Sequence, residues 1–294
     1  MAYSNQEQRM NASAGLASVG TAGLLVAIKA WALWQTGALS VGASLADSAV
    51  DLVISAAGLV AILYAAKPAD DDHAFGHSSA EDLAALGQAL IVLGSAAAIG
   101  IAAVRRLLSP TPPELAAQGA GIAVMIASAL ITAALVWWQG RVARSTGNKV
   151  VAADRLHYVG DLLPTLGAIL ALWLSHDFGW SDVDSIVALI AAAIMLSGAG
   201  RIGVGAWNAL MDRAAPDDVI EGIAAIARDW PGVRGFHDLK TRTAGAQIFV
   251  NLHIELDGDQ TLEEAHDIGA ALKRAIVEAY PQADVIIHKD VYRS

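Results

Sequence analysis

The chain has 294 residues, of which 55% are hydrophobic and only 16% charged, and its mean hydropathy is +0.48. Ordinary soluble domains carry about 25% charged residues, so this composition excludes that class and predicts a membrane protein. Cysteine is absent, which excludes disulfides and thiolate metal sites, and the net charge of −10 argues against a nucleic-acid partner.

Six hydrophobic segments follow one another in the first 211 residues, and each is near the ~20 residues that a membrane-spanning helix needs. They are residues 12–36, 40–65, 83–107, 115–138, 150–174 and 183–210. An even number of spans places both termini on one side of the lipid bilayer. More positively charged residues fall on that side than on the other, so we expect it to be the cytoplasm; these are Arg9, Lys67, Arg141, Arg144, Lys149 and Arg213, against Arg105 and Arg106.

Two of these segments carry paired polar residues. Asp47 and Asp51 lie in the second segment, and His157 and Asp161 lie in the fifth. Each pair has i,i+4 spacing, which stacks both side chains on one face of a helix. An Asp at mid-membrane costs roughly 2.5–3.5 kcal/mol, so such residues are functional candidates. Four nitrogen and oxygen donors on two helices suit a tetrahedral divalent metal. The alternative is hydrogen bonding between helices, which Ser or Asn would provide at lower cost.

The connection between the second and third segments is acidic and contains two histidines. Its residues Asp70, His73 and His77 have the composition of a second, more exposed metal site. The alternative is a solvated acidic loop with incidental histidines, in which Asp71 and Asp72 only attract cations.

The remainder of the chain, residues 212–294, has the patterns of a separate small domain. A helix is predicted from Pro216 to Trp230, strands over 233–243 and 247–256, a second helix from Thr261 to Tyr280, and a strand over 284–288. Thr261 and Glu264 form a predicted capping box at the start of the second helix. The order αββαβ predicts an α+β domain with its helices on one face of a sheet.

Four of the eight histidines lie in this second domain, at His237, His253, His266 and His288. His288 and Asp290 share one face of a strand, because strand side chains alternate. Convergence with His237 and His253 on the neighbouring strands predicts a further metal site, and chance surface histidines are the alternative.

Five of these stretches, in this order, resemble the cation diffusion facilitator family and specifically its bacterial zinc and iron efflux branch. The stretches are Ser-Leu-Ala-Asp-Ser-Ala-Val-Asp, Asp-Asp-Asp-His-Ala-Phe-Gly-His, His-Tyr-Val-Gly-Asp, His-Asp-Leu-Lys-Thr-Arg and Val-Ile-Ile-His-Lys-Asp. The resemblance implies a homodimer in the bacterial inner membrane, with six transmembrane helices and a cytoplasmic metallochaperone-like domain in each protomer.

The resemblance also implies roles for the candidate residues. Asp47, Asp51, His157 and Asp161 would form the transport site, and Asp70, His73 and His77 a loop site. His237, His253, His266, His288 and Asp290 would form a binuclear site that stabilises the dimer. The sequence departs from its relatives at Ser79, where they often carry a lysine that pairs with the position of Asp212. Arg213 and Lys67 are the candidates to replace that lysine.

The leading functional prediction is export of Zn²⁺ in exchange for protons, with Fe²⁺ and Cd²⁺ as further cargo and Zn²⁺ also as a structural or regulatory ion. The alternative is a membrane-anchored metal sensor that dimerises through its cytoplasmic domain. An enzyme is not expected: intramembrane aspartyl proteases need Gly-x-Gly-Asp, and Tyr158 stands three residues before Asp161. The sequence also has no Gly-x-x-x-x-Gly-Lys loop, so no nucleotide partner is expected.

Overall fold

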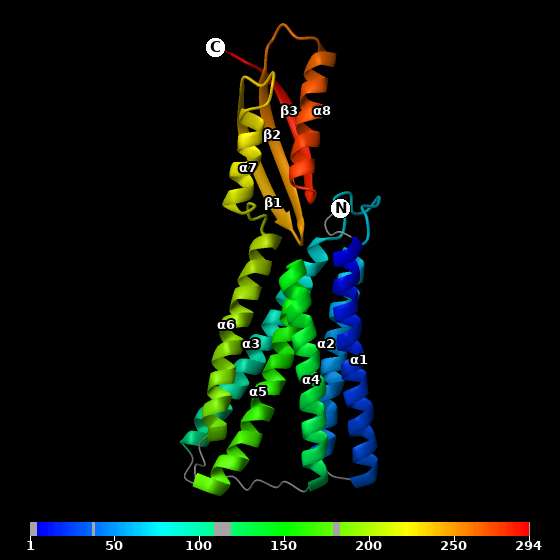
Figure 1. Ribbon diagram of the computed structural model, residues 1–294, viewed down its shortest axis with the longest axis vertical. Coiled ribbons are helices and arrows are strands. Elements are labelled where there is room, and N and C mark those ends of the chain that lie inside the picture. Colours follow the sequence, from blue (N-terminus) through cyan, green and yellow to red (C-terminus); the bar gives the residue numbers. More distant parts are fainter. Residues whose placement is uncertain (1–4, 37–38, 109–118, 179–182, 294) are drawn as a thin grey trace.

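The computed structural model describes the backbone of residues 5–36, 39–108, 119–178 and 183–293, and side chains there except at 36, 39–44, 46, 119–125, 164–178 and 183–184. It contains a bundle of six long helices and a smaller α+β domain stacked on one end (Figure 1). The six helices are α1 (Asn5–Thr36), α2 (Leu39–Ala65), α3 (Ser79–Leu107), α4 (Gly119–Thr146), α5 (Lys149–Phe178) and α6 (Val183–Leu210). The predicted start of the fourth segment, residues 115–118, lies outside the described residues.

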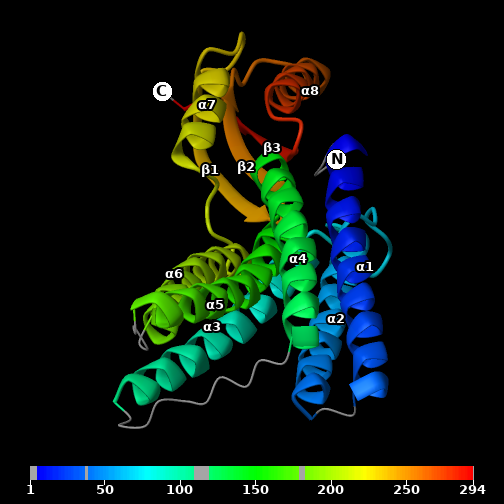
Figure 2. The same ribbon diagram turned by 60° about the horizontal axis from the view of Figure 1, so that its bottom comes forward.

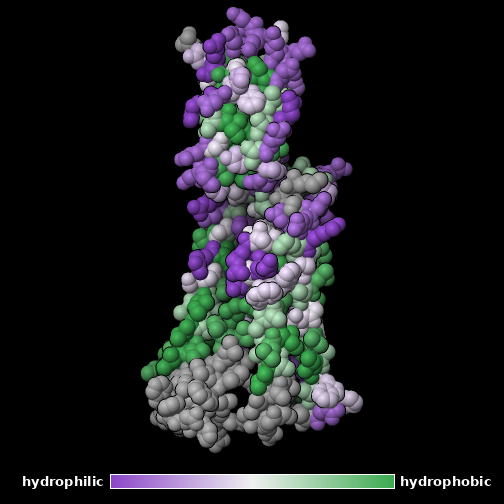
Figure 3. Space-filling view, in the orientation of Figure 1, coloured by the Kyte–Doolittle hydropathy of each residue, from purple (hydrophilic) through white to green (hydrophobic). Residues whose placement is uncertain are grey.

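The bundle has an apolar exterior. Within the described residues, α1, α2, α3, α4 and α6 are each long and apolar enough to cross a membrane. Large hydrophobic side chains such as Val53, Leu90 and Val204 are more than half exposed on the helix surfaces. Figure 3 shows hydrophobic surface over much of the helical part on the face in view, whereas the domain above it is mostly hydrophilic. Because a membrane rather than water suits such a surface, the predicted multi-pass membrane fold is confirmed.

Small residues allow the helices to approach one another closely. Ala14, Ala85, Ala96 and Ala199 are fully buried between helices. Helices α3, α5 and α6 diverge from α1, α2 and α4 toward the end far from the small domain (Figure 2). Contacts of α5 with α1, α2 and α4 join the two groups of helices.

The C-terminal domain has the predicted order αββαβ. It consists of α7 (Asp217–Arg228), β1 (Gly235–Ala244), β2 (Gln247–Leu256), α8 (Leu262–Ala279) and β3 (Ala283–Val291). The strand order is β1-β2-β3, with β1 antiparallel and β3 parallel to β2. The predicted capping box is present: the Thr261 hydroxyl accepts from the Glu264 amide at 3.2 Å, and the Glu264 carboxylate accepts from the Thr261 amide at 2.8 Å.

The core of this domain lies on one face of the sheet. Alternate β2 residues from Ile248 to Leu256 are buried against Ile223 of α7 and Leu272 of α8. Both helices therefore cover the same face, as predicted, and the opposite face is free for other side chains.

The two parts meet at the start of α3. The buried carboxylate of Asp82 accepts hydrogen bonds from Lys149 Nζ and from the Gly245 amide in the β1–β2 turn, both at 2.6 Å. Gly245 has a φ of 55°, and a Cβ there would lie 2.8 Å from the carbonyl oxygen of Ser78, so a larger residue is excluded.

Among the described residues of one protomer, Asp212 pairs with neither Arg213 nor Lys67, and a role of these two residues between protomers stays a prediction. Arg242 pairs with Asp212 at 3.3 Å and also stacks 4.1 Å from the centre of the Phe249 ring. The pairing follows from the turn of β1 back toward the end of α6, which the sequence does not reveal.

Candidate metal centres

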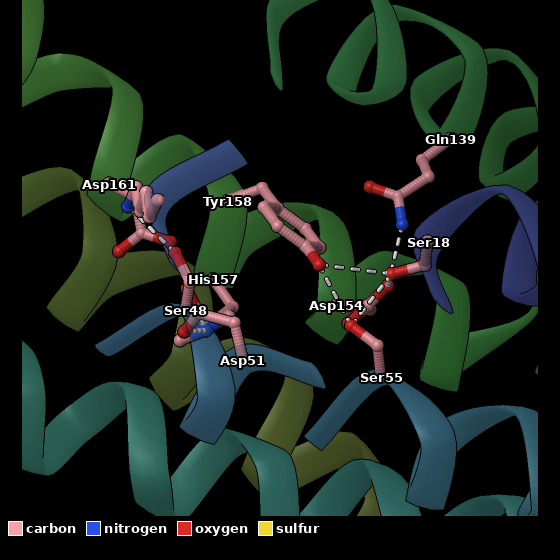
Figure 4. Close-up of polar contacts among 10 residues, drawn as sticks. Ser18, Ser48, Asp51, Ser55, Gln139, Asp154, His157, Tyr158 and Asp161 are labelled. Atoms are coloured by element: carbon pink, nitrogen blue, oxygen red, sulfur yellow. Dashed lines mark hydrogen bonds and ion pairs between the residues drawn. The ribbon is translucent and has the colours of Figure 1, made fainter. Parts of the chain in front are cut away.

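The membrane part contains a group of three ligand-type side chains from two helices. His157 Nε2 of α5 lies 2.9 Å from Asp51 Oδ1 of α2 and 3.9 Å from Asp161 Oδ2 of α5. These atoms all fall within 4.8 Å of one another, which is close enough for a single metal ion to contact all three. The side chains of Asp51 and His157 are 18% and 9% exposed, and that of Asp161 is 49% exposed, so the group opens on one side. Figure 4 shows these three side chains close together.

The fourth predicted ligand lies outside this group. Asp47 is one helical turn before Asp51 on α2, and it is exposed. Its neighbour Ser48 accepts a 2.7 Å hydrogen bond from Lys29 Nζ of α1. The structure therefore brings together three of the four predicted residues and adds a cation from a third helix.

Lys29 was not singled out from the sequence, and neither was Asp154. Asp154 lies on α5, is 5% exposed, and accepts hydrogen bonds from Ser18, Ser55 and Gln139. A signal existed for both, because a charged residue inside an apolar span is rare and needs partners. The sequence does not reveal the partners of Asp154, because they are uncharged and lie on other helices.

The three residues of the predicted loop site lie close together. Asp70, His73 and His77 have ligand atoms within 4.8 Å of one another. His77 Nδ1 lies 3.2 Å from the carbonyl oxygen of Pro68, which can only accept, so this nitrogen carries the proton. Its Nε2 lies 3.3 Å from Asp70 Oδ2. If a metal ion bound to both atoms, His77 would be a ligand whose other ring nitrogen is oriented by a carbonyl. A hydrogen bond from the backbone amide of His73 lowers the pKa of Asp70, which keeps this carboxylate ionised.

A third group lies on the open face of the sheet. His237, His253 and His288 are directly opposite one another on β1, β2 and β3. Asp290 contacts all three rings: its oxygens are 3.5 Å from His237 Nε2, 2.9 Å from His253 Nδ1 and 3.2 Å from His288 Nε2. His266 is exposed on α8, on the helical side of the sheet, so the protomer does not bring it to this group.

The charge of Asp290 is stabilised by this row of histidines. The hydrogen bond with His253 lowers the pKa of Asp290 below its ordinary 3.8, and attraction to the three rings lowers it further. Ionised Asp290 therefore stabilises the folded domain at pH values above the unfolded pKa of about 3.9, and the contribution is lost as pH falls through the lower folded-state pKa.

We expect Asp290→Asn to destabilise the metal-free domain at pH 7 and to have almost no effect once the pH is well below 3.8. Hydrogen exchange of the β1–β3 amides in the full chain measures this difference. The exposed loop residue Asp259 provides a control, because Asp259→Asn should be neutral at both pH values. Equal destabilisation by Asp290→Asn at both pH values would contradict the assignment.

A helical membrane bundle with ligand-type clusters in it, in a connecting loop and on an attached sheet defines a multi-pass membrane protein equipped for metal ions. Residues 15–211 match the family model described as cation efflux transmembrane domain, and residues 215–292 match that described as cation efflux protein, cytoplasmic domain. The chain belongs to this cation efflux family, the cation diffusion facilitators, which are transporters of divalent metal ions and not enzymes.

Individual relatives agree over almost the full length. The cation-efflux pumps FieF of Escherichia fergusonii and of Shigella flexneri serotype 5b are each 40% identical over 282 residues, which is 96% of this chain and 93% of the relative. A solved structure of the MamM CTD in a nickel form is 28% identical, covers 26% of this chain and 100% of its own, and has a TM-score of 0.26. This last likeness is local and says nothing about the membrane helices.

Proposed function

We propose that the chain exports divalent metal ions from the cytoplasm in exchange for protons, with Zn²⁺ as the main cargo. The observation that carries this proposal is the contact between Asp51 of α2 and His157 of α5 at 2.9 Å. A nitrogen–oxygen hydrogen bond of this length needs one proton between the two atoms. These are the atoms that would bind the metal, so metal and proton compete for one position.

The donor types favour Zn²⁺ among the common ions. One imidazole with two carboxylates suits Zn²⁺, whose ligands in proteins are histidine, carboxylate and thiolate. The same donors also accept Fe²⁺ and Cd²⁺, which we propose as secondary cargo. Asp47, one turn along α2, would complete a set of four ligands when the metal binds.

We further propose a homodimer in the inner membrane of a bacterium, with both termini in the cytoplasm and domain limits of 1–211 and 212–294. In this arrangement the loop group of Asp70, His73 and His77 and the sheet group around Asp290 face the compartment from which the metal is taken. Their predicted role is to hold Zn²⁺ as a regulatory or structural ion. His266 would reach a metal only through the partner protomer.

The decisive experiment is Zn²⁺ uptake into proteoliposomes under an imposed pH gradient. We expect uptake to accelerate when the lumen is acidic relative to the outside, because protons that leave the lumen are then exchanged for metal ions that enter it. Uptake should slow when an ionophore collapses the pH gradient. The other candidate, a membrane-anchored metal sensor, predicts binding without flux. Metal binding without Zn²⁺ flux, both with the pH gradient and after its collapse, would therefore reject the transporter and favour the sensor.

A further inference from the structure

We propose that a buried cluster around Asp154 is a positioning site that holds α5 so that His157 faces Asp51. The cluster consists of Ser18, Ser55, Gln139, Asp154 and Tyr158 (Figure 4). The inference rests on the proposed function only in that the Asp51–His157 group must bind the transported metal.

The cluster joins four helices through one carboxylate. Asp154 Oδ2 of α5 accepts from Ser18 Oγ of α1 and from Gln139 Nε2 of α4, both at 2.6 Å, and Oδ1 accepts from Ser55 Oγ of α2 at 3.4 Å. The Tyr158 hydroxyl closes the network by a 2.9 Å hydrogen bond with Ser55. Each of the helices α1, α2 and α4 therefore contributes a hydrogen-bond donor to Asp154 of α5.

The residues that make these hydrogen bonds are buried. Ser18, Ser55, Gln139 and Tyr158 are at most 1% exposed, so bulk water cannot replace the hydrogen bonds that they make within the cluster. A buried carboxyl group with good hydrogen bonds seldom stabilises a fold more than apolar packing would, and in some proteins such groups instead specify a single arrangement of the elements around them. The cluster therefore defines where α5 sits more than how tightly the bundle holds together.

The ligand group and the cluster are adjacent layers of one helix contact. Ser55 follows Asp51 by four residues on α2, and Asp154 precedes His157 by three on α5, so each step is about one turn. Tyr158 is next to His157, and their rings meet edge-on with centroids 5.7 Å apart. A slide or rotation of α5 that breaks the cluster must therefore also displace the imidazole from Asp51.

The cluster is not itself a second metal site. The cavity beside it has a volume of only about 10 Å³ and is lined by Ser55, Gln139 and Asp154 together with apolar side chains. Gln139 Oε1 is buried there without a hydrogen-bond partner among the described residues. This is room for at most one water molecule, which Gln139 Oε1 would hold, and not for a hydrated ion.

The test compares Zn²⁺ and Co²⁺ binding to the full chain, in a parent that carries Asp70→Ala and Asp290→Ala so that the membrane group dominates binding. We expect Asp154→Asn to weaken binding about 10- to 100-fold, as is typical when a group that orients a ligand is lost, and to alter the visible spectrum of bound Co²⁺. Ser55→Ala, which leaves the carboxylate in place, should weaken binding in the same direction but less.

Asp82→Asn is the matched control, because Asp82 is also a buried carboxylate with short hydrogen bonds but lies at the domain junction. It should lower thermal stability and leave the affinity and the Co²⁺ spectrum unchanged. If Asp154→Asn and Ser55→Ala lower only the stability, with affinity within twofold of the parent, the positioning role is overturned. If the parent binds no metal that Asp51→Ala removes, the proposed function and this inference fall together.

Discussion

Replacing Asp51 with alanine is expected to abolish pH-driven Zn²⁺ flux and to weaken binding at the membrane group by more than about 100-fold. Asp51 contributes the only ligand atom from α2 among the three that the structure brings together. Its removal leaves His157 with Asp161 on the same helix, and on α2 only the proposed fourth ligand, Asp47, which lies outside this group. The measurement is initial uptake into proteoliposomes together with the metal content of the purified protein.

The matched control for this variant is Asp72→Ala, which removes a carboxylate from the exposed loop and outside every ligand group of the described residues. We expect it to retain nearly full flux, since an exposed charge attracts cations only weakly at physiological ionic strength. Flux that survives in Asp51→Ala at the level of this control would remove Asp51 from the mechanism.

Replacing Asp82 with alanine is expected to produce the largest loss of stability at the junction between the two parts. The side chain is 1% exposed, and its removal leaves both the Lys149 ammonium and the Gly245 amide without this acceptor. Breaking a buried ion pair by deleting one partner costs about 3–5 kcal/mol. Because Lys149 is 31% exposed and regains water, we expect about 2–3 kcal/mol here.

Thermal unfolding in detergent, combined with limited proteolysis at the β1–β2 turn, measures this loss. Asp212→Asn is the comparison, because the Asp212 carboxylate also forms an ion pair close to the end of α6 but is 69% exposed. Exposed pairs contribute about 1 kcal/mol or less. Similar losses in the two variants would show that burial of Asp82 does not set the strength of the junction.

Most of the fold was predictable because hydrophobic runs and strand alternation are local signals. The ends of the helices were less predictable. Helix α3 begins at Ser79 and not near residue 83, since Glu81 and Asp82 find partners in Asn148 and Lys149 and can be buried within the helix. Polar residues of this kind resemble a loop until their partners are known.

The candidate sites also contain residues that the sequence reveals and contacts that it does not. Pairs such as Asp51 and His157 stand out because they are ionisable groups in apolar segments, and their i,i+4 companions are read directly from the sequence. Contacts such as Ser18 with Asp154 join residues far apart in the chain, and serine has no distinctive pattern in a membrane helix. The complete ligand sets, with Asp47 and His266 included, stay predictions.

The row of histidines lies on the sheet face opposite the hydrophobic core, and this separation has a consequence for how the domain matures. The side chains that hold α7 and α8 on the sheet do so without help from any ligand atom. A nascent chain can therefore complete this domain before it meets an ion, in contrast to zinc fingers, which remain unfolded until loaded. A chelator should therefore remove a metal ion bound at the row of histidines and leave the domain folded and able to bind an ion again.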